Sequence, residues 1–189
     1  MSSTYGNRGM TFESLIEYAN SRYRHTGAAI VEKQHTLCKP LRNGTGSIVS
    51  AKYEEKATVD FMGRFGGRPI AFEAKHCSED KIDLKRVEEH QCGFLRDWTA
   101  EPTAVGFILI SFQFTAFYLI PWDYWQAALD ARETRRKGAV AFEPAGTEWM
   151  TTGKASIRKD ELPAEWEVQM GGAAAIDYLA AVRRLWKIT

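Results

Sequence analysis

The longest uninterrupted apolar stretch of the chain runs from Val105 to Ile110, and it has the length of a β-strand. A membrane-spanning helix needs about 18 or more consecutive apolar residues, so the sequence predicts no membrane span. Apolar residues continue around this stretch and predict two neighbouring strands, at 103–112 and 115–120. The 189 residues suit one domain of common size, so we expect residues 1–189 to share a single core.

Helices and further strands are expected on both sides of these two strands. Helical spacing of apolar residues predicts helices at about 12–26, 83–98, 121–132 and 173–187. Strands are expected at 28–31, 57–61 and 68–75, the last two forming a hairpin around a turn region with Gly63, Gly66 and Gly67. This order predicts an α/β architecture, a mixed sheet with helices packed against it.

The region from Gln34 to Lys52 shows no clear hydrophobic period and contains Pro40 and two glycines. It carries Lys39, Arg42 and Lys52 but no Asp or Glu, so we expect a basic protruding loop or stalk. Such a loop either contacts phosphates or is merely solvated, and the lack of acids favours phosphate contact slightly.

The overall charge does not favour nucleic-acid binding, because the chain has 25 basic and 24 acidic residues and a net charge of +1. A polyanionic partner would therefore require the positive charges to be sorted onto one face. Three cysteines are few and odd in number, and the first eight residues lack the apolar centre of a signal peptide. Both observations favour a cytoplasmic protein.

The residues Asp60, Glu73 and Lys75 form the most informative candidate site. Residues two apart on a strand point to the same face, so Glu73 and Lys75 project together while Ala74 turns into the core. An antiparallel hairpin brings Asp60 beside Glu73, and two adjacent carboxylates repel each other unless a cation lies between them. Mg²⁺ suits such oxygen ligands, with Mn²⁺ as an alternative ion.

This arrangement is typical of metal-assisted hydrolysis of a phosphodiester, with the Lys75 ammonium beside the transition state. The acid-x-Lys pattern alone is weak, since it occurs four times in the sequence. Only at Glu73 does it end an apolar strand-like run with an aspartate upstream. The alternative interpretation is a surface salt bridge.

Several segments together resemble the RecU family of bacterial Holliday junction resolvases and follow that family's order over nearly the whole chain. They are Asn7-Arg8-Gly9-Met10, Phe12-Glu13, Thr58-Val59-Asp60, Phe72-Glu73-Ala74-Lys75, His90-Gln91, Ile108-Leu109-Ile110-Ser111, 156–162 and Ile176-Asp177-Tyr178. The resemblance implies a restriction-endonuclease-like nuclease domain that acts as a homodimer. It also implies the use of Mg²⁺ to nick four-way DNA junctions.

The resemblance further implies metal-site roles for Thr58, Asp60, Glu73 and Gln91, a transition-state role for Lys75 and a DNA contact at Arg8. Thr58 and Asp60 are two apart on an expected strand, so both would face the metal. The Gln91 amide oxygen could bind the ion or accept from its water, although an exposed helix glutamine is the alternative. Glu13 could orient a metal-bound water, or it could simply favour the start of a helix.

We therefore expect a Mg²⁺-dependent endodeoxyribonuclease that resolves Holliday junctions in recombination and repair. Its expected partners are branched DNA, a second copy of the chain and recombination proteins. The protrusion at 34–52 is shorter than the family's, so a nuclease of the same fold with duplex, flap or unspecific preference remains an alternative. A catalytically inactive junction-binding protein is the other alternative.

Overall fold

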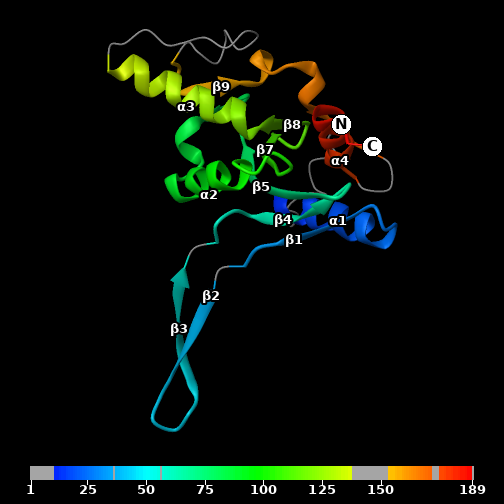
Figure 1. The fold of residues 1–189 in the computed structure, drawn as a ribbon. Coiled ribbons are helices and arrows are strands. Elements are labelled where there is room, and N and C mark those ends of the chain that lie inside the picture. The colour runs from blue at the N-terminus through cyan, green and yellow to red at the C-terminus, as the bar shows by residue number, and fades with distance from the viewer. Residues whose placement is uncertain (1–10, 36, 56, 138–152, 172–174, 189) are drawn as a thin grey trace, which may run out of the picture.

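A six-stranded mixed sheet forms the centre of the molecule (Figure 1), which is a computed structural model describing residues 11–35, 37–55, 57–137, 153–171 and 175–188. Along the sheet the strands follow the order β1, β4, β5, β7, β8, β10. Their bounds are β1 (Ala29–Lys33), β4 (Phe61–Phe65), β5 (Arg68–Cys77), β7 (Val105–Phe112), β8 (Ala116–Pro121) and β10 (Glu167–Val168). β5 and β7 are parallel, and the other neighbours are antiparallel.

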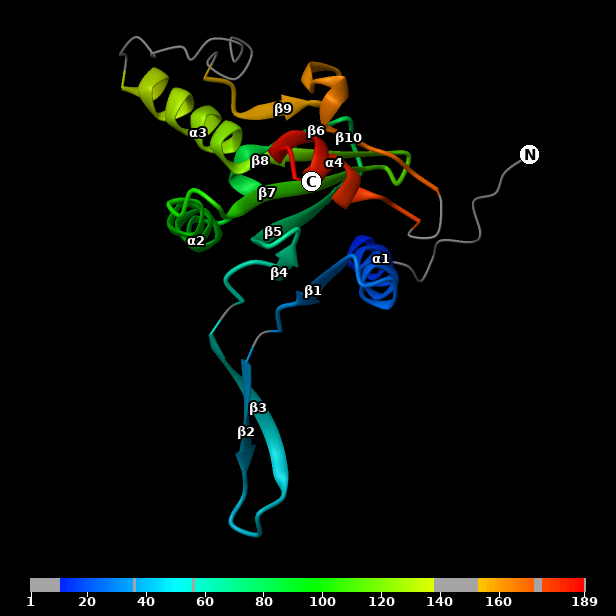
Figure 2. The same cartoon turned by 45° about the vertical axis from the view of Figure 1, so that its right-hand side comes forward.

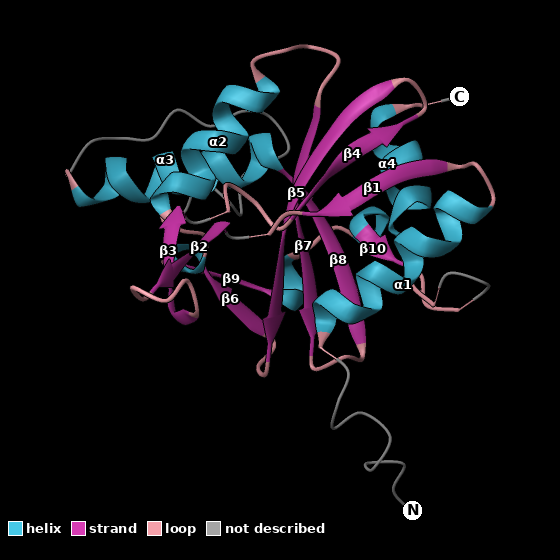
Figure 3. Cartoon of the chain, turned by 90° about the horizontal axis from the view of Figure 1, so that it is seen from below, coloured by secondary structure: helices cyan, strands magenta, loops and turns pink. Residues whose placement is uncertain are grey.

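Helices cover both faces of this sheet (Figure 3), which confirms the predicted mixed α/β architecture. The helices α1 (Phe12–His25) and α4 (Tyr178–Trp186) pack on one face. On the other face lie α2 (Glu89–Thr99) and α3 (Trp122–Arg136). Alternate residues of β5, β7 and β8 therefore enter two separate apolar clusters, and β7 is buried along its whole length.

The hairpin of β4 and β5 has a different turn from the expected one. The expected strand at 57–61 begins only at Phe61, and the turn is restricted to Gly66 and Gly67, both with positive φ. Gly63 is not part of the turn but lies inside β4, opposite Val31. A Cβ at this position would lie 2.0 Å from the carbonyl oxygen of Ile30, so close strand approach explains this glycine.

β4 accompanies β5 over only part of its length. Their pairing begins with Phe61 opposite Phe72, whereas β5 continues to Cys77 with β7 as its partner on the other side. Just before β4 begins, the backbone N–H of Gln34 donates to the carbonyl oxygen of Asp60 at 2.7 Å and extends the β1–β4 pairing by one residue. Asp60 is thus held at the point where β4 joins the sheet.

The expected basic protrusion is an ordered two-stranded ribbon rather than a loop. β2 (Leu37–Arg42) and β3 (Ile48–Glu55) pair antiparallel and project away from the central sheet (Figure 2). The ribbon ends at Glu55, three residues after the predicted end at Lys52. At its tip, the Asn43 side-chain oxygen accepts from the backbone N–H groups of Thr45 and Ser47. This side-chain-to-backbone bonding stabilises the turn. It leaves no hydrophobic period in the sequence from which the ribbon could be predicted.

Two predicted helices begin later than expected. Residues 81–83 form β6, which pairs with β9 (Ser156–Arg158), and Leu84–Arg86 form a short 3-10 helix before α2 begins. α4 begins after Asp177, whose side chain accepts from the N–H of Ala180. In both cases a capping residue sets the start, although the apolar pattern extends further upstream.

None of the helices in the described residues has the length and apolar composition that crossing a bilayer requires.

Candidate active site

Two hydrogen bonds join Asp60 to Glu73 and Ala74 across the start of the β4–β5 hairpin. The Asp60 N–H donates to Glu73 Oε2 at 3.2 Å, and Asp60 Oδ2 accepts from the N–H of Ala74 at 2.9 Å. Because Ala74 belongs to the apolar cluster under α1, its side chain points away from the carboxylates, as predicted. The expected juxtaposition of the two acids is confirmed.

Glu73 is almost completely buried, with 1 % of its surface exposed, yet its carboxylate is well bonded. Lys75 Nζ lies 2.5 Å from Glu73 Oε1, which confirms that these side chains project together. The Lys75 side chain is 17 % exposed, so this ammonium is close to solvent while it contacts the buried acid.

Gln91 is the second donor to the same oxygen, with its Nε2 2.7 Å from Glu73 Oε1. Its Oε1 accepts from the backbone N–H of Glu88 at 2.8 Å and so completes a capping box at the start of α2. The alternative of an exposed helix glutamine is therefore wrong, because Gln91 is buried and joins α2 to the acid on β5. Its amide oxygen, which was expected to face the metal, is bonded to the helix start.

Burial and the neighbouring charge of Asp60 raise the pKa of Glu73 from its usual 4.5 to about 7, and Lys75 partly opposes this rise. Burial and the Asp60 charge disfavour the ionised form of Glu73, and a further cation would stabilise that form. The donors are carboxylate oxygens, which hard divalent ions such as Mg²⁺ prefer.

The residues present therefore fit a hard divalent ion held by Asp60 and Glu73. Among the described residues, no group of three or more His, Cys, Asp or Glu side chains is placed to hold a metal. Two protein carboxylates suit an ion that keeps several waters and also binds substrate phosphate.

The other predicted site residues lie before β4, on the ribbon or outside the described residues. Thr58 lies in a bend before β4 with an exposed side chain, so the expected strand placement is wrong, and its metal-site role stays a prediction. Lys39 and Arg42 are exposed on the ribbon, and the backbone position of Lys52 lies opposite Lys39. Arg8 lies outside the described residues.

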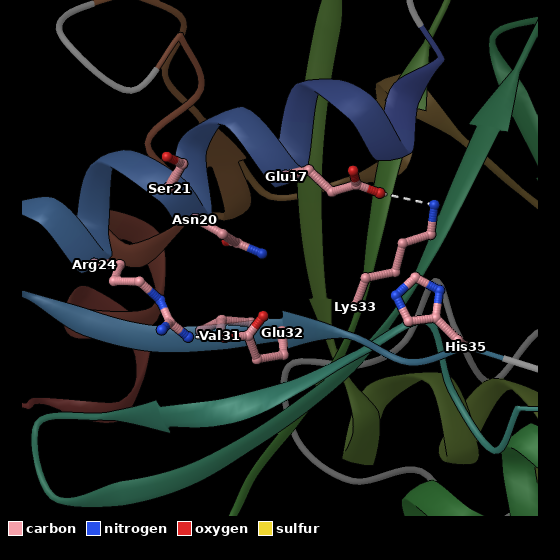
Figure 4. Close-up of a pocket in the computed structure, with 8 residues that line it drawn as sticks. All are labelled: Glu17, Asn20, Ser21, Arg24, Val31, Glu32, Lys33 and His35. Carbon is pink, nitrogen blue, oxygen red and sulfur yellow. Dashed lines mark ion pairs between the residues drawn. The ribbon is translucent and has the colours of Figure 1, made fainter.

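Glu13 is paired with Lys33, which lines a hollow between α1 and β1 together with Glu17 (Figure 4). Lys33 Nζ lies 2.8 Å from the carboxylate of Glu13 and 2.7 Å from that of Glu17. Both hydrogen bonds raise the pKa of Lys33. The proposed water-orienting role of Glu13 stays a prediction, and in the structure this residue pairs with β1.

Comparison with known proteins gives a consistent set of matches. The family model described as "Recombination protein U" matches residues 7–184. "Holliday junction resolvase RecU" of Bacillus pumilus is 28% identical over 193 residues, covering 97% of this chain and 83% of that protein. The protein of the same name from Staphylococcus carnosus is 30% identical over 188 residues, covering 96% and 82%.

A solved structure of Hjc, a Holliday junction resolvase of Archaeoglobus fulgidus, aligns with 57% of this chain and 77% of its own. The TM-score is 0.36 and the sequence identity is 9%. This likeness is too slight to support an argument about either fold or site.

Proposed function

The chain belongs to the RecU family of recombination proteins, and from this premise we propose that it is a Mg²⁺-dependent endodeoxyribonuclease that resolves four-way DNA junctions. The relatives named above carry the name Holliday junction resolvase, and resolvases are nucleases. The single observation that supports the chemistry best is the bonded pair of Asp60 and Glu73 with Lys75 against it.

Asp60 and Glu73 would hold the ion. When bound, Mg²⁺ would supply polarisation of the scissile phosphate and a lower pKa for the attacking water. The protein's own part is positioning: Gln34 and Ala74 fix Asp60 through its carbonyl and carboxylate, while Gln91 fixes Glu73. Preorganised carboxylates need no rearrangement before the substrate arrives.

Lys75 would stabilise the negative charge that develops on the phosphate. In the structure its ammonium contacts Glu73, and a second cation bound by that carboxylate would weaken this pair. The ammonium would then be available to a phosphate oxygen beside the two acids. Such a fixed charge is most effective in a partly buried site like this one.

Junction recognition would involve two copies of the chain and the ribbon of β2 and β3. A homodimer has a two-fold axis, which matches the symmetry of a four-way junction and the need for paired nicks. The ribbon is exposed around Lys39 and Arg42, and Leu41, Ile48 and Val49 near its tip are also solvent-accessible. Cations and apolar groups together suit a branched DNA surface.

The deciding experiment compares labelled four-way junction, duplex, flap and single-stranded DNA, each with Mg²⁺, with Mn²⁺ and with EDTA. We expect symmetric nicks in the junction with either ion, and none with EDTA. Equal cutting of junction and duplex would instead support a nuclease of the same fold without junction selectivity. Binding of the junction without cutting under every condition would support an inactive binding protein.

A further inference from the structure

In the described part of the chain, the sheet face that carries Glu73 is open to solvent beyond the active site, at Ile30 of β1 and Arg64 of β4. Met62 packs against the apolar cluster under α2 and therefore lies on that face. Strand alternation places Arg64, two residues further along β4, on the same side. There Arg64 is exposed, and so is Ile30, its partner on β1, with 40 % of its surface accessible.

Arg64 lies at a hollow of about 540 Å³ at the end of this face. Arg24 and the glycines of the β4–β5 turn also line the hollow, and among its described lining residues none is acidic. Arg24 is paired with Glu32, whereas Arg64 forms no ion pair with any described residue. A solvent-facing guanidinium without an acidic partner is well suited to bidentate binding of a phosphate.

The distance to the catalytic pair fits one strand of DNA. Arg64 lies on β4 four residues after Asp60, which immediately precedes the strand, so the two residues are at most roughly 13 Å apart at about 3.3 Å per residue. Successive phosphates of one strand rise roughly 3.4 Å along the helix axis and also wind round it, so this span covers at most about four nucleotides. A nucleic acid strand bound at Asp60 and Glu73 can therefore pass over Met62 and reach Arg64 on the same face.

We infer that Arg64, with Arg24 beside it, forms a backbone-phosphate subsite for the DNA strand being cut, within about four nucleotides of the scissile phosphate. This inference rests on the proposed function, because it takes the position of the scissile phosphate from Asp60 and Glu73. The subsite binds phosphate and reads no base. Its effect is to fix which phosphate of the strand lies over the catalytic carboxylates.

Arg68 provides a matched control, because it lies on the same hairpin but on the opposite face, in line with Ile70 and Phe72 of the α1 cluster. Arg64→Ala and Arg68→Ala remove the same charge. Junction binding is measured in EDTA over a range of KCl concentrations. We expect Arg64→Ala to lower the salt-dependence slope by about one unit and Arg68→Ala to leave it unchanged.

A scan with single methylphosphonates, which are neutral, locates the contact. Wild-type protein should lose affinity at one position within about four nucleotides of the cut, and Arg64→Ala should be insensitive there. Equal slopes and equal sensitivity in wild type and Arg64→Ala would overturn the inference. If wild type binds with the expected Arg64 dependence but never cuts with Mg²⁺, the subsite stands and the proposed nuclease activity fails.

Discussion

Gln91 donates to the carboxylate of Glu73 with the same amide group that closes the N-terminal cap of α2. Through this one side chain, the position of Glu73, the proposed metal-binding acid, depends on where α2 begins. Because Gln91 and Glu73 are both buried, water cannot replace the bond between them without opening the core. The cap and the active site are consequently expected to respond together to mutation.

Replacing Gln91 by alanine should therefore reduce both stability and cutting. Loss of the cap and of the bond to Glu73 is expected to lower the free energy of unfolding by about 2 kcal/mol. The turnover number should fall by about tenfold or more with little change in junction affinity, because the acid is misplaced while the DNA surface is intact. Urea denaturation and single-turnover cutting measure the two effects. Glu89 lies on the same helix turn but is exposed, so Glu89→Ala should change neither the free energy of unfolding nor the turnover number.

Neutral isosteres of the two acids should separate chemistry from binding. Asp60→Asn and Glu73→Gln are expected to bind a four-way junction normally but to cut it at least about a hundredfold more slowly, because the metal site loses charge. Gel shift in EDTA and cutting with Mg²⁺ test this. Either variant cutting at the wild-type rate would remove these residues from the mechanism.

Stability of the metal-free protein should depend on pH through Glu73. Its pKa is about 7 in the folded protein and about 4.5 when unfolded, so the folded state binds the proton more tightly. The stabilising effect of protonation is complete below about pH 4.5 and is lost as the pH rises through 7. The free energy of unfolding should fall by up to about 3 kcal/mol over this range.

Urea titrations in EDTA between pH 5 and 8 measure this fall. Glu73→Gln cannot ionise at that position, so its stability should change much less over the same range. Mg²⁺ should stabilise wild type at pH 8 but have little effect at pH 5, where protons compete for the carboxylate. The same pH slope in wild type and Glu73→Gln would show that other groups cause it.

Two glycine substitutions should have opposite effects. A methyl group at Gly63 would meet the carbonyl oxygen of Ile30 at 2.0 Å, so Gly63→Ala should cost about 2 kcal/mol or more. Gly93 lies inside α2 with nothing within 4 Å of the added carbon, so Gly93→Ala should gain about 1 kcal/mol. Thermal unfolding of both variants gives the sign directly.

The orientation of Glu73 and Lys75 in the candidate site was predictable because strand alternation depends only on neighbouring residues. It places Glu73 and Lys75 together and turns Ala74 away, whatever surrounds them. The pairing of Asp60 with Glu73 followed from the hairpin alone. Thr58 was misplaced because β4 begins at Phe61, and nothing in the apolar pattern marks that start.

Other features depend on contacts between distant segments. The ribbon pairs residues such as Pro40 and Ala51 whose sequence has no strand period, and its turn is stabilised by the side chain of Asn43. In the β7–β8 turn, Gln113 and Phe114 have positive φ. Glycine or asparagine usually occupies such positions, so the residue types did not predict this turn. Burial of Gln91 requires α2 to pack over β5, and local sequence patterns do not specify this packing.

The attachment of the ribbon has a mechanical consequence. β3 ends five residues before Asp60, and β2 begins three residues after Gln34, whose N–H is bonded to the Asp60 carbonyl. Both strands of the ribbon therefore join the rest of the chain close to Asp60. Tilting of the ribbon would therefore shift Asp60, so in the proposed nuclease DNA binding by the ribbon would be coupled to the position of a metal-binding carboxylate.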